Sequence, residues 1–225
     1  RKAFILAYDI HEEWKSSEAF LHSMLPNKAI SALKRGQKLF AEWIENGTIV
    51  FVQICDFNRF VENMPPRKLI NFLNDIFLQF DSLVDKHNVY KIETVNEYYM
   101  AGSGILKNDK YHAVNSAACA VAMLKVCAKL SEKLDGEQVT IKIGMNSGSL
   151  IAGVIGLKQI NYRVFGDTVN IASRMCANSQ PGKVMITKRT ATYLKKSRNY
   201  KFDVEDLGEK EIKGCLLYTS DAADD

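Results

Sequence analysis

The spacing of hydrophobic residues changes several times along the chain, and each change marks a new structural element. Residues 3–25 repeat apolar side chains every seven positions, as in a helix that forms a short two-stranded coiled coil or that folds back on its own core. Pro26 ends this helix, and a short amphipathic stretch with Ile30 and Leu33 follows and ends near Gly36. The repeat is too short to decide between the two arrangements of the first helix.

After residue 47 the pattern alternates between the two-residue period of strands and the wider period of helices. A buried strand is expected at 48–55, because this run is β-branched and apolar. The further elements expected, in chain order, are a helix from Pro65-Pro66 to about Asp85, a strand region at 89–104 with a turn near Asn96, a helix marked by residues 114–128, a hairpin at 139–154 that turns at Gly148, a helix at 167–176, and short strands at 184–186 and 201–207. This mixture predicts an α+β fold, a ferredoxin-like sheet of βαββαβ type with helices packed on it.

Composition and charge exclude several function classes. The 225 residues carry a net charge of +4 without a dense basic block, so nucleic-acid binding is not expected. The five cysteines form no CxxC pair, and we expect them to be reduced, as in a reducing compartment. No apolar run reaches the ~18 residues of a membrane span, and no signal peptide is visible. Because the chain begins with Arg1, we expect it to be a piece of a larger protein.

The segment 162–175 combines a helix start with polar side chains suited to phosphate chemistry. Asp167 and Thr168 are residue types that suit capping positions at the start of a helix. Asn170 and Arg174 are four residues apart and therefore share one helical face, where an amide and a guanidinium can clamp ribose and phosphate oxygens. The same spacing also fits a solvated helix face that carries an incidental arginine.

Three stretches of this sequence resemble one known family. Residues 165–175 read FGDTVNIASRM and resemble the FGDTVNxASRM signature of the class III adenylyl and guanylyl cyclase family. Residues 143–156 resemble that family's IGIHTGxVxAGxxG hairpin, and residues 24–26 with 33–36 are similar to its lead-in. Long motifs in the same order are far more specific than a lone glycine pattern. The resemblance covers about residues 20–214.

The resemblance implies a head-to-tail dimer with the active site between its two halves. In this family a ribose 3′-hydroxyl attacks the α-phosphate, pyrophosphate leaves, and two Mg²⁺ ions stabilise the attacking and leaving oxygens. Carried over to this sequence, Asn170 and Arg174 position the ribose and stabilise charge on the α-phosphate, and Lys213 contacts the phosphates. Positioning and electrostatics then dominate the catalysis.

The sequence departs from the family at the two metal positions. The family's first strand reads FxDIxGFT with an aspartate ligand, and this chain has Gln53 there. A neutral amide is a poor substitute for a carboxylate on Mg²⁺. The second ligand lies in a GDxYM motif, where this chain has Glu97, one methylene longer than aspartate. We therefore expect this half to resemble the metal-free half of heterodimeric cyclases, with Mg²⁺ or Mn²⁺ ligated mainly by the partner half.

Two further positions read the base in this family. Glu93 matches guanylyl cyclases, because its carboxylate can accept from the two N–H donors on the pairing edge of guanine, where an adenine-binding enzyme has lysine. The second position, commonly Cys in guanylyl and Asp in adenylyl cyclases, is Arg163, which can donate to guanine O6 but departs from both patterns. An ion pair of Glu93 with Lys91 or Arg163 is the structural alternative.

The resemblance therefore predicts a guanylate cyclase domain that forms 3′,5′-cyclic GMP and pyrophosphate from GTP, as one half of a hetero- or intramolecular dimer. A catalytically inactive regulatory domain and an adenylyl cyclase half that uses ATP are the alternatives. Lead-in helices are expected at 1–46, the catalytic domain at 47–214, and a tail of non-native origin at 215–225. The domain is expected on the cytoplasmic side, as part of a larger membrane-bound protein.

Overall fold

The computed structural model describes residues 21–22, 24–37, 39–131, 138–155, 160–195, 197, 201–212 and 215–223. Most of the helix predicted over residues 3–25 lies outside these ranges. The chain divides into two compact units. Unit 1 comprises residues 1–42 and 151–164, and unit 2 comprises residues 43–150 and 165–225.

Helices and strands follow in the mixed order expected of an α+β fold, which confirms the predicted fold class. In chain order the described elements are α2 (Asn27–Lys34), β1 (Phe40–Ile54), α3 (Phe57–Asn63), α4 (Pro66–Lys86), β2 (Tyr90–Val95), β3 (Tyr98–Ser103), α5 (His112–Ser131), β4 (Ile141–Ile155), β5 (Asn161–Phe165), α6 (Asp167–Asn178), β6 (Val184–Thr187), α7 (Lys188–Leu194), β7 (Asp203–Ile212) and β8 (Cys215–Ala223).

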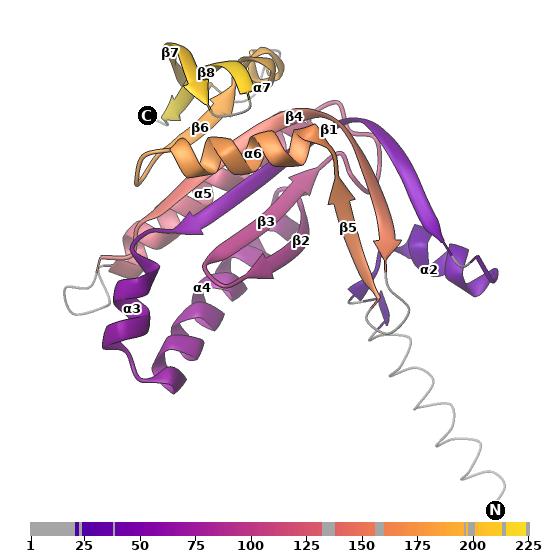
Figure 1. Cartoon of the computed structure of the whole chain (residues 1–225), viewed down its shortest axis with the longest axis horizontal. Coiled ribbons are helices and arrows are strands. Elements are labelled where there is room, and N and C mark those ends of the chain that lie inside the picture. Colours follow the sequence, from indigo (N-terminus) through magenta and orange to yellow (C-terminus); the bar gives the residue numbers. More distant parts are fainter. Residues whose placement is uncertain are drawn as a thin grey trace, which may run out of the picture. The chain divides into compact units, whose positions relative to one another are not determined.

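One eight-stranded sheet organises these elements, with strand order β2-β3-β1-β4-β6-β8-β7 and with β5 paired to β4. Strands β1 and β3 are antiparallel, whereas β4 and β6 are parallel. Within unit 2, α4 and α5 lie on one face of the sheet and α6 lies on the other (Figure 1). Strand alternation accounts for this division, since Ile143 and Met145 of β4 enter the main core with α4 and α5, while Gly144 between them faces α6.

The main core of unit 2 forms where α4 and α5 cover the sheet. Alternate residues of β1, namely Val50, Val52 and Ile54, are buried there because successive side chains of a strand point to opposite faces. Helix α4 buries one face at intervals of four residues, including Phe80, whose ring meets that of Tyr99 edge-on at 5.5 Å. Pro66 begins α4 as the sequence predicts.

Helix α5 is the most buried helix of this core. By length and composition it is apolar enough to cross a membrane, the one such helix within the described ranges. Eleven of its residues are buried in unit 2, as expected of a central core helix. Cys119 and Cys127 are free thiols within it, and burial raises the pKa of each to about 12. Cys55 and Cys176 are also free, and the reduced state of the thiols stays a prediction.

The predicted hairpin with a turn at Gly148 is wrong, because β4 runs uninterrupted from Ile141 to Ile155. Gly148 does not adopt a positive φ, and a Cβ atom there would lie 2.5 Å from Thr168 Oγ1. At Gly144 a Cβ atom would lie 1.9 Å from the backbone nitrogen of Cys176. The two glycines therefore mark the close approach of α6 to the strand rather than a change of direction.

Replacing Gly144 with alanine is expected to destabilise the protein by about 3 kcal/mol or more, since the clash is with helix backbone and not with a movable side chain. Urea unfolding followed by circular dichroism measures this change. Ser149→Ala, which removes one oxygen from the same strand, is the matched control and is expected to stay close to the wild-type stability. Equal urea midpoints of unfolding for the two variants would contradict the close approach of α6 to β4 at Gly144.

Two strands extend beyond the sequence prediction. Strand β1 begins at Phe40 rather than near residue 48, so the predicted boundary at residues 46 and 47 falls inside it. Residues 215–223, which the sequence analysis set apart as a tail, form β8 and pair with β6 and β7. Their non-native origin stays a prediction.

Unit 1 contains the short helix α2, which confirms the predicted amphipathic stretch and buries Ile30. Lys28 of α2 forms an ion pair with Glu42 at 3.1 Å, and the Tyr162 hydroxyl donates to the same carboxylate at 3.3 Å. The rings of Tyr162 and Phe40 lie 6.5 Å apart. These contacts join α2, the start of β1 and β5 within the unit.

Candidate active site

Helix α6 is held against β4 by its buried face. Thr168, Ala172, Met175 and Cys176 form this face, at the spacing of one side of a helix. Near the end of α6, the Lys142 ammonium donates to the carbonyl of Ala177 at 3.2 Å. The expected capping by Asp167 or Thr168 is wrong: Gly166 is the N-cap, no side chain caps the helix, and the Thr168 hydroxyl donates to the carbonyl of Ser149 at 2.6 Å.

Asn170 and Arg174 lie on the side of α6 that faces away from β4. Asn170 is exposed and Arg174 is half-buried. Their four-residue spacing places them one turn apart, so both can reach the same bound molecule. The structure therefore places these two predicted site residues together on one helical surface of unit 2.

Glu93 lies on β2, next to an irregularity in the strand pairing. The register of β2 against β3 shifts between Lys91 and Glu93, which leaves Ile92 as the extra residue of a bulge. Lys91 forms an ion pair with Asp81 at 2.8 Å, and the Tyr99 hydroxyl donates to the same carboxylate at 2.7 Å. Lys91 thus has an acidic partner other than Glu93. Glu93 itself is half-buried.

Arg163 and Lys213 are the other two predicted site residues. Arg163 is an exposed residue of β5 in unit 1, whereas Glu93, Asn170 and Arg174 belong to unit 2. Lys213 lies outside the described residues.

The two family metal positions meet in one surface depression of unit 2. This depression has a volume of about 420 Å³, and its lining includes Gln53, Glu97 and Asp56. Glu97 is in the turn between β2 and β3, and its carbonyl accepts from the backbone N–H of Ile54 at 3.1 Å, which fixes it beside the end of β1. The side chain of Gln53 hydrogen-bonds the hydroxyl of Tyr98, its cross-strand partner.

These residues do not fit a two-metal site. The Gln53 amide is neutral and is engaged by Tyr98, and within the described ranges no group of three or more His, Cys, Asp or Glu side chains is arranged to hold a metal ion. Burial raises the pKa of Tyr98, and the neighbouring Glu97 carboxylate adds to this effect. Tyr98 is a residue that the sequence reasoning missed, since only the strand register pairs it with Gln53.

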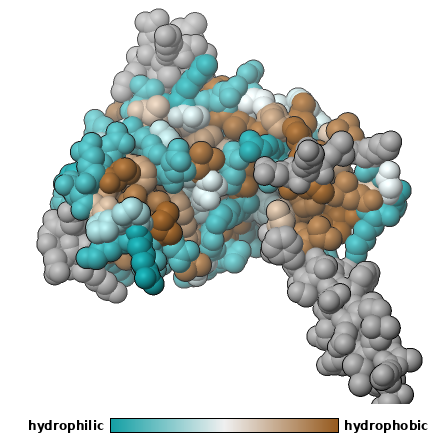
Figure 2. All heavy atoms as spheres, turned by 60° about the horizontal axis from the view of Figure 1, so that its bottom comes forward, coloured by the Kyte–Doolittle hydropathy of each residue, from teal (hydrophilic) through white to brown (hydrophobic). Residues whose placement is uncertain are grey.

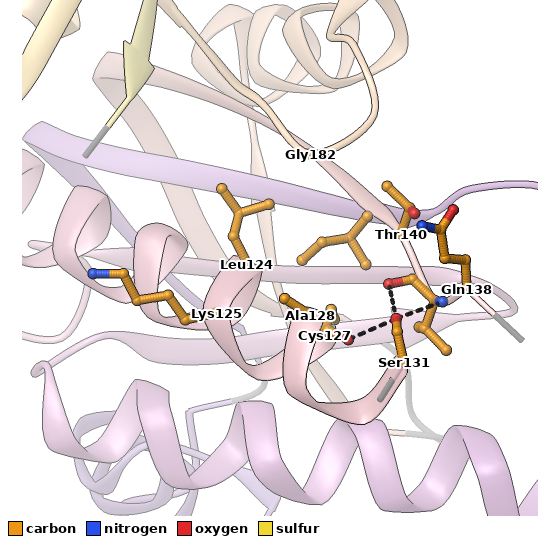
Figure 3. A pocket seen from close by; sticks show the side chains of 10 residues that line it. Leu124, Lys125, Cys127, Ala128, Ser131, Gln138, Thr140 and Gly182 are labelled. Atoms are coloured by element: carbon orange, nitrogen blue, oxygen red, sulfur yellow. Dashed lines mark hydrogen bonds between the residues drawn. The ribbon is translucent and has the colours of Figure 1, made fainter. Parts of the chain in front are cut away.

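A larger cavity of unit 2, about 770 Å³ in volume, lies away from the predicted site residues. It opens between the last turns of α5 and the start of β4, and its walls are mostly apolar (Figure 3). Ser131 closes one side, donating to the carbonyl of Cys127 at 3.0 Å and accepting from the backbone N–H of Val139 at 2.8 Å. None of the predicted catalytic or base-reading residues lines it.

Comparison with curated proteins relates the chain to guanylate cyclases. It is 36% identical over 208 residues to the receptor-type guanylate cyclase gcy-7 of Caenorhabditis elegans, a match that covers 92% of this chain and 18% of the relative. It is 34% identical over 210 residues to the guanylate cyclase soluble subunit beta-2 of Rattus norvegicus, covering 93% of this chain and 30% of that subunit. The chain thus spans less than a third of the length of these relatives.

Solved structures agree with the sequence comparison. The guanylate cyclase domain of RhGC from Catenaria anguillulae, solved in complex with GTP, is 28% identical with a TM-score of 0.73, covering 80% of this chain and 97% of that domain. The adenylyl cyclase CyaB from P. aeruginosa shares the fold, with a TM-score of 0.77 at 22% identity, covering 83% of this chain and 97% of CyaB.

The family model of the adenylate and guanylate cyclase catalytic domain matches residues 39–221, which include α6, the two metal positions and both base-reading positions. The chain therefore belongs to the class III adenylyl and guanylyl cyclase catalytic domain family, and the two curated relatives named above are guanylate cyclases.

Proposed function

We propose that this chain supplies the purine-, ribose- and phosphate-binding half of a guanylate cyclase active site, which forms cyclic GMP and pyrophosphate from GTP. The observation that carries the proposal is a contrast within unit 2. Helix α6 keeps the signature residues Asn170 and Arg174 on its outer face, while the depression of the metal positions holds Gln53, engaged by Tyr98.

Asn170 and Arg174 act on the nucleotide by positioning and charge. The Asn170 amide can hold the ribose so that its 3′-hydroxyl faces the α-phosphate. The Arg174 guanidinium offers donors to the phosphate oxygens where negative charge grows as pyrophosphate leaves. Because the buried face of α6 is packed on β4, the helix backbone that carries both groups is in place before the substrate arrives.

The proposal requires a second cyclase homology domain, in another chain or elsewhere in the same one. Mg²⁺ or Mn²⁺ would be ligated mainly by carboxylates of that partner half. Exposed apolar residues support pairing: within unit 1, Leu39, Ile151 and Ile155 are 73%, 42% and 52% exposed. Figure 2 shows apolar side chains gathered in surface patches among hydrophilic ones. A guanylyl cyclase domain from Blastocladiella emersonii that forms a non-canonical dimer is among the similar solved structures.

The parent protein is inferred from the relatives. Both receptor-type and soluble guanylate cyclases match nearly the whole chain. We propose that the domain lies on the cytoplasmic side of a larger membrane-bound protein and acts in cyclic-nucleotide signalling.

Base preference gives a direct prediction. Glu93→Lys is expected to lower kcat/KM for GTP by about tenfold or more, because lysine cannot accept from the N–H donors of guanine. The ratio of kcat/KM for GTP to kcat/KM for ATP is therefore expected to fall. Turnover of each nucleotide by the assembled dimer measures the ratio. Glu93→Gln, which keeps the size and one acceptor, is the matched variant and is expected to fall between wild type and Glu93→Lys. An unchanged GTP-to-ATP ratio for Glu93→Lys would favour an adenylyl cyclase half.

The direct test of the proposed function is reconstitution. This chain is mixed with a cyclase half that carries both metal aspartates, and product formation from GTP and from ATP is assayed with Mg²⁺ and with Mn²⁺. Cyclic GMP formed by the mixture, and by neither component alone, is the expected result. No product with any metal-competent half would remove the enzymatic function.

A second candidate is a regulatory domain that pairs and binds nucleotide without chemistry. Two observations favour it: Arg163 departs from both base-reading patterns, and Gln53 stands at a metal position. The two candidates differ in what Arg174 does, because only an enzyme half needs this side chain for turnover.

A further inference from the structure

A continuous chain of hydrogen-bonded side chains crosses the sheet of unit 2, from α5 on one face to α6 on the other. None of its seven residues is more than 6% exposed. In order, they are His112, Thr48, Ser147, Thr190, Thr187, Asn146 and Thr168, the last through its backbone carbonyl. Consecutive atoms are 2.7 to 3.1 Å apart, so every link is an ordinary hydrogen bond.

The direction of every bond in this chain follows from its last link. The Asn146 amide nitrogen donates to the carbonyl of Thr168 at 3.1 Å, so the Asn146 oxygen must accept, and the Thr187 hydroxyl donates to it at 2.8 Å. A hydroxyl has one proton to donate. With the proton of Thr187 committed, Thr190 must donate to Thr187, and Ser147 must donate to Thr190.

The same rule continues to the histidine. Thr48 must donate to Ser147, because the proton of Ser147 is already committed to Thr190. The hydroxyl of Thr48 can then only accept from the ring of His112, whose Nδ1 lies 2.7 Å away. Nδ1 of His112 therefore carries a proton, and all the protons of the chain point from α5 towards α6.

We propose that this one-directional chain, from Nδ1–H of His112 to the carbonyl of Thr168, positions the first turn of α6 and with it Asn170 and Arg174. The inference rests on the proposed function only in what it says of turnover. His112, Ser147 and Asn146 are positioning residues, because they act on the nucleotide through α6.

The start of α6 depends on this chain because the helix has no side-chain cap. Its first turn is tied to β4 by two bonds, from Asn146 to the carbonyl of Thr168 and from the Thr168 hydroxyl to the carbonyl of Ser149 at 2.6 Å. Asn170 follows two residues later. Without the bond from Asn146, only the bond from the Thr168 hydroxyl to the carbonyl of Ser149 holds this turn against β4. The side-chain amide of Asn170 can then shift relative to the sheet.

The residues around His112 hold its ring in an orientation from which Nδ1–H can donate to Thr48. Its ring meets that of Tyr193 edge-on at 4.7 Å, and the Tyr193 hydroxyl donates to Asn46 at 2.8 Å. Burial lowers the pKa of His112, Asp109 raises it and Arg189 lowers it further. The neutral Nδ1–H form and the cation both donate from Nδ1, so the chain keeps its direction whether or not the ring is protonated.

The first test needs no substitution. Nitrogen-15 NMR of the full chain, labelled at histidine, distinguishes a protonated Nδ1 from a protonated Nε2. A neutral His112 ring with its proton on Nδ1 is the expected result. A neutral ring protonated on Nε2 would overturn the proposed direction of the chain.

The second test compares two side chains of similar shape at position 112. His112→Asn keeps an N–H donor near the position of Nδ1, whereas His112→Leu removes it. In the assembled dimer, His112→Leu is expected to lower kcat about tenfold, the equivalent of one hydrogen bond, with KM for GTP nearly unchanged. His112→Asn is expected to retain near wild-type kcat. Equal kcat values for the two variants would overturn the proposal.

A measurement that does not depend on turnover separates this inference from the proposed function. Hydrogen exchange of the Val169 and Asn170 amides, which bond the carbonyl of Gly166, reports on the first turn of α6. Ser147→Ala breaks the chain and is expected to speed this exchange, whereas Ser149→Ala on the same strand is not. An inactive wild-type dimer would contradict the proposed function but not the positioning role of the hydrogen-bonded chain. Unchanged exchange rates of the Val169 and Asn170 amides in Ser147→Ala would contradict the positioning role but not the proposed function.

Discussion

Arg174→Ala is expected to lower kcat of the assembled dimer by about 10²- to 10³-fold, the loss typical for one group aimed at transition-state charge. The side chain is half-buried on the outer face of α6, and the buried face of that helix is unaffected. The fold should therefore survive the change, and KM for GTP should rise far less than kcat falls. Steady-state cyclic GMP formation with a metal-competent partner half measures both constants.

Two further variants on the same helix make this result specific. Arg174→Lys keeps the charge but loses the planar fork of donors, and should recover only part of the activity. Ser173→Ala, at the exposed neighbouring position, is the control and should match the wild type. Should Arg174→Ala turn over as fast as Ser173→Ala, the chain contributes no catalytic group, and the regulatory candidate replaces the enzymatic one.

Placing aspartate at both metal positions, 53 and 97, is expected to make the chain active without a foreign partner. The wild-type chain alone should give no detectable product with Mg²⁺ or Mn²⁺. The double variant Gln53→Asp with Glu97→Asp should raise turnover of the self-paired chain by on the order of 10²-fold or more over that background, because each half would then carry metal ligands as well as Asn170 and Arg174.

The choice of these two positions follows from the depression around Gln53. Gln53 and Glu97 already line the same depression, so two substitutions suffice to place two aspartates there. Adding Arg174→Ala to the double variant should abolish the gain, which controls for contaminating cyclase. If the wild-type chain by itself converts GTP with magnesium bound at Gln53, the division of labour between two halves is refuted.

The long helices and the hairpin of β2 and β3 could be predicted because their signals are local. Pro65-Pro66 marked the start of α4, and a turn near Asn96 was predicted where the structure has a positive φ of 52°. Each of these signals depends on one residue type in one backbone conformation. No knowledge of distant neighbours was needed to interpret them.

The course of β4 could not be predicted, because glycine has two structural uses that look alike in a sequence. Gly148 follows a strand-like run and precedes another, which is the pattern of a turn. In the structure the same residue makes room for Thr168, some 20 positions along the chain. A long-range contact decided between the two uses.

The candidate site shows the same limit. The four-residue spacing of Asn170 and Arg174 was sufficient to place them on one helical face. Nothing local pairs Gln53 with Tyr98, since the register of β1 against β3 brings them together. The buried hydrogen bonds from His112 to Thr168 likewise join six separate elements of unit 2, so no single motif contains them.

The glycine at position 144 has a consequence for how this site can vary. No side chain separates β4 from α6 there, so the spacing between strand and helix is a property of two backbones in contact. Any residue larger than glycine would clash with the backbone of α6, so only glycine fits at this position. The distance between the sheet and the backbone that carries Asn170 and Arg174 is therefore set at this point by direct contact of strand and helix.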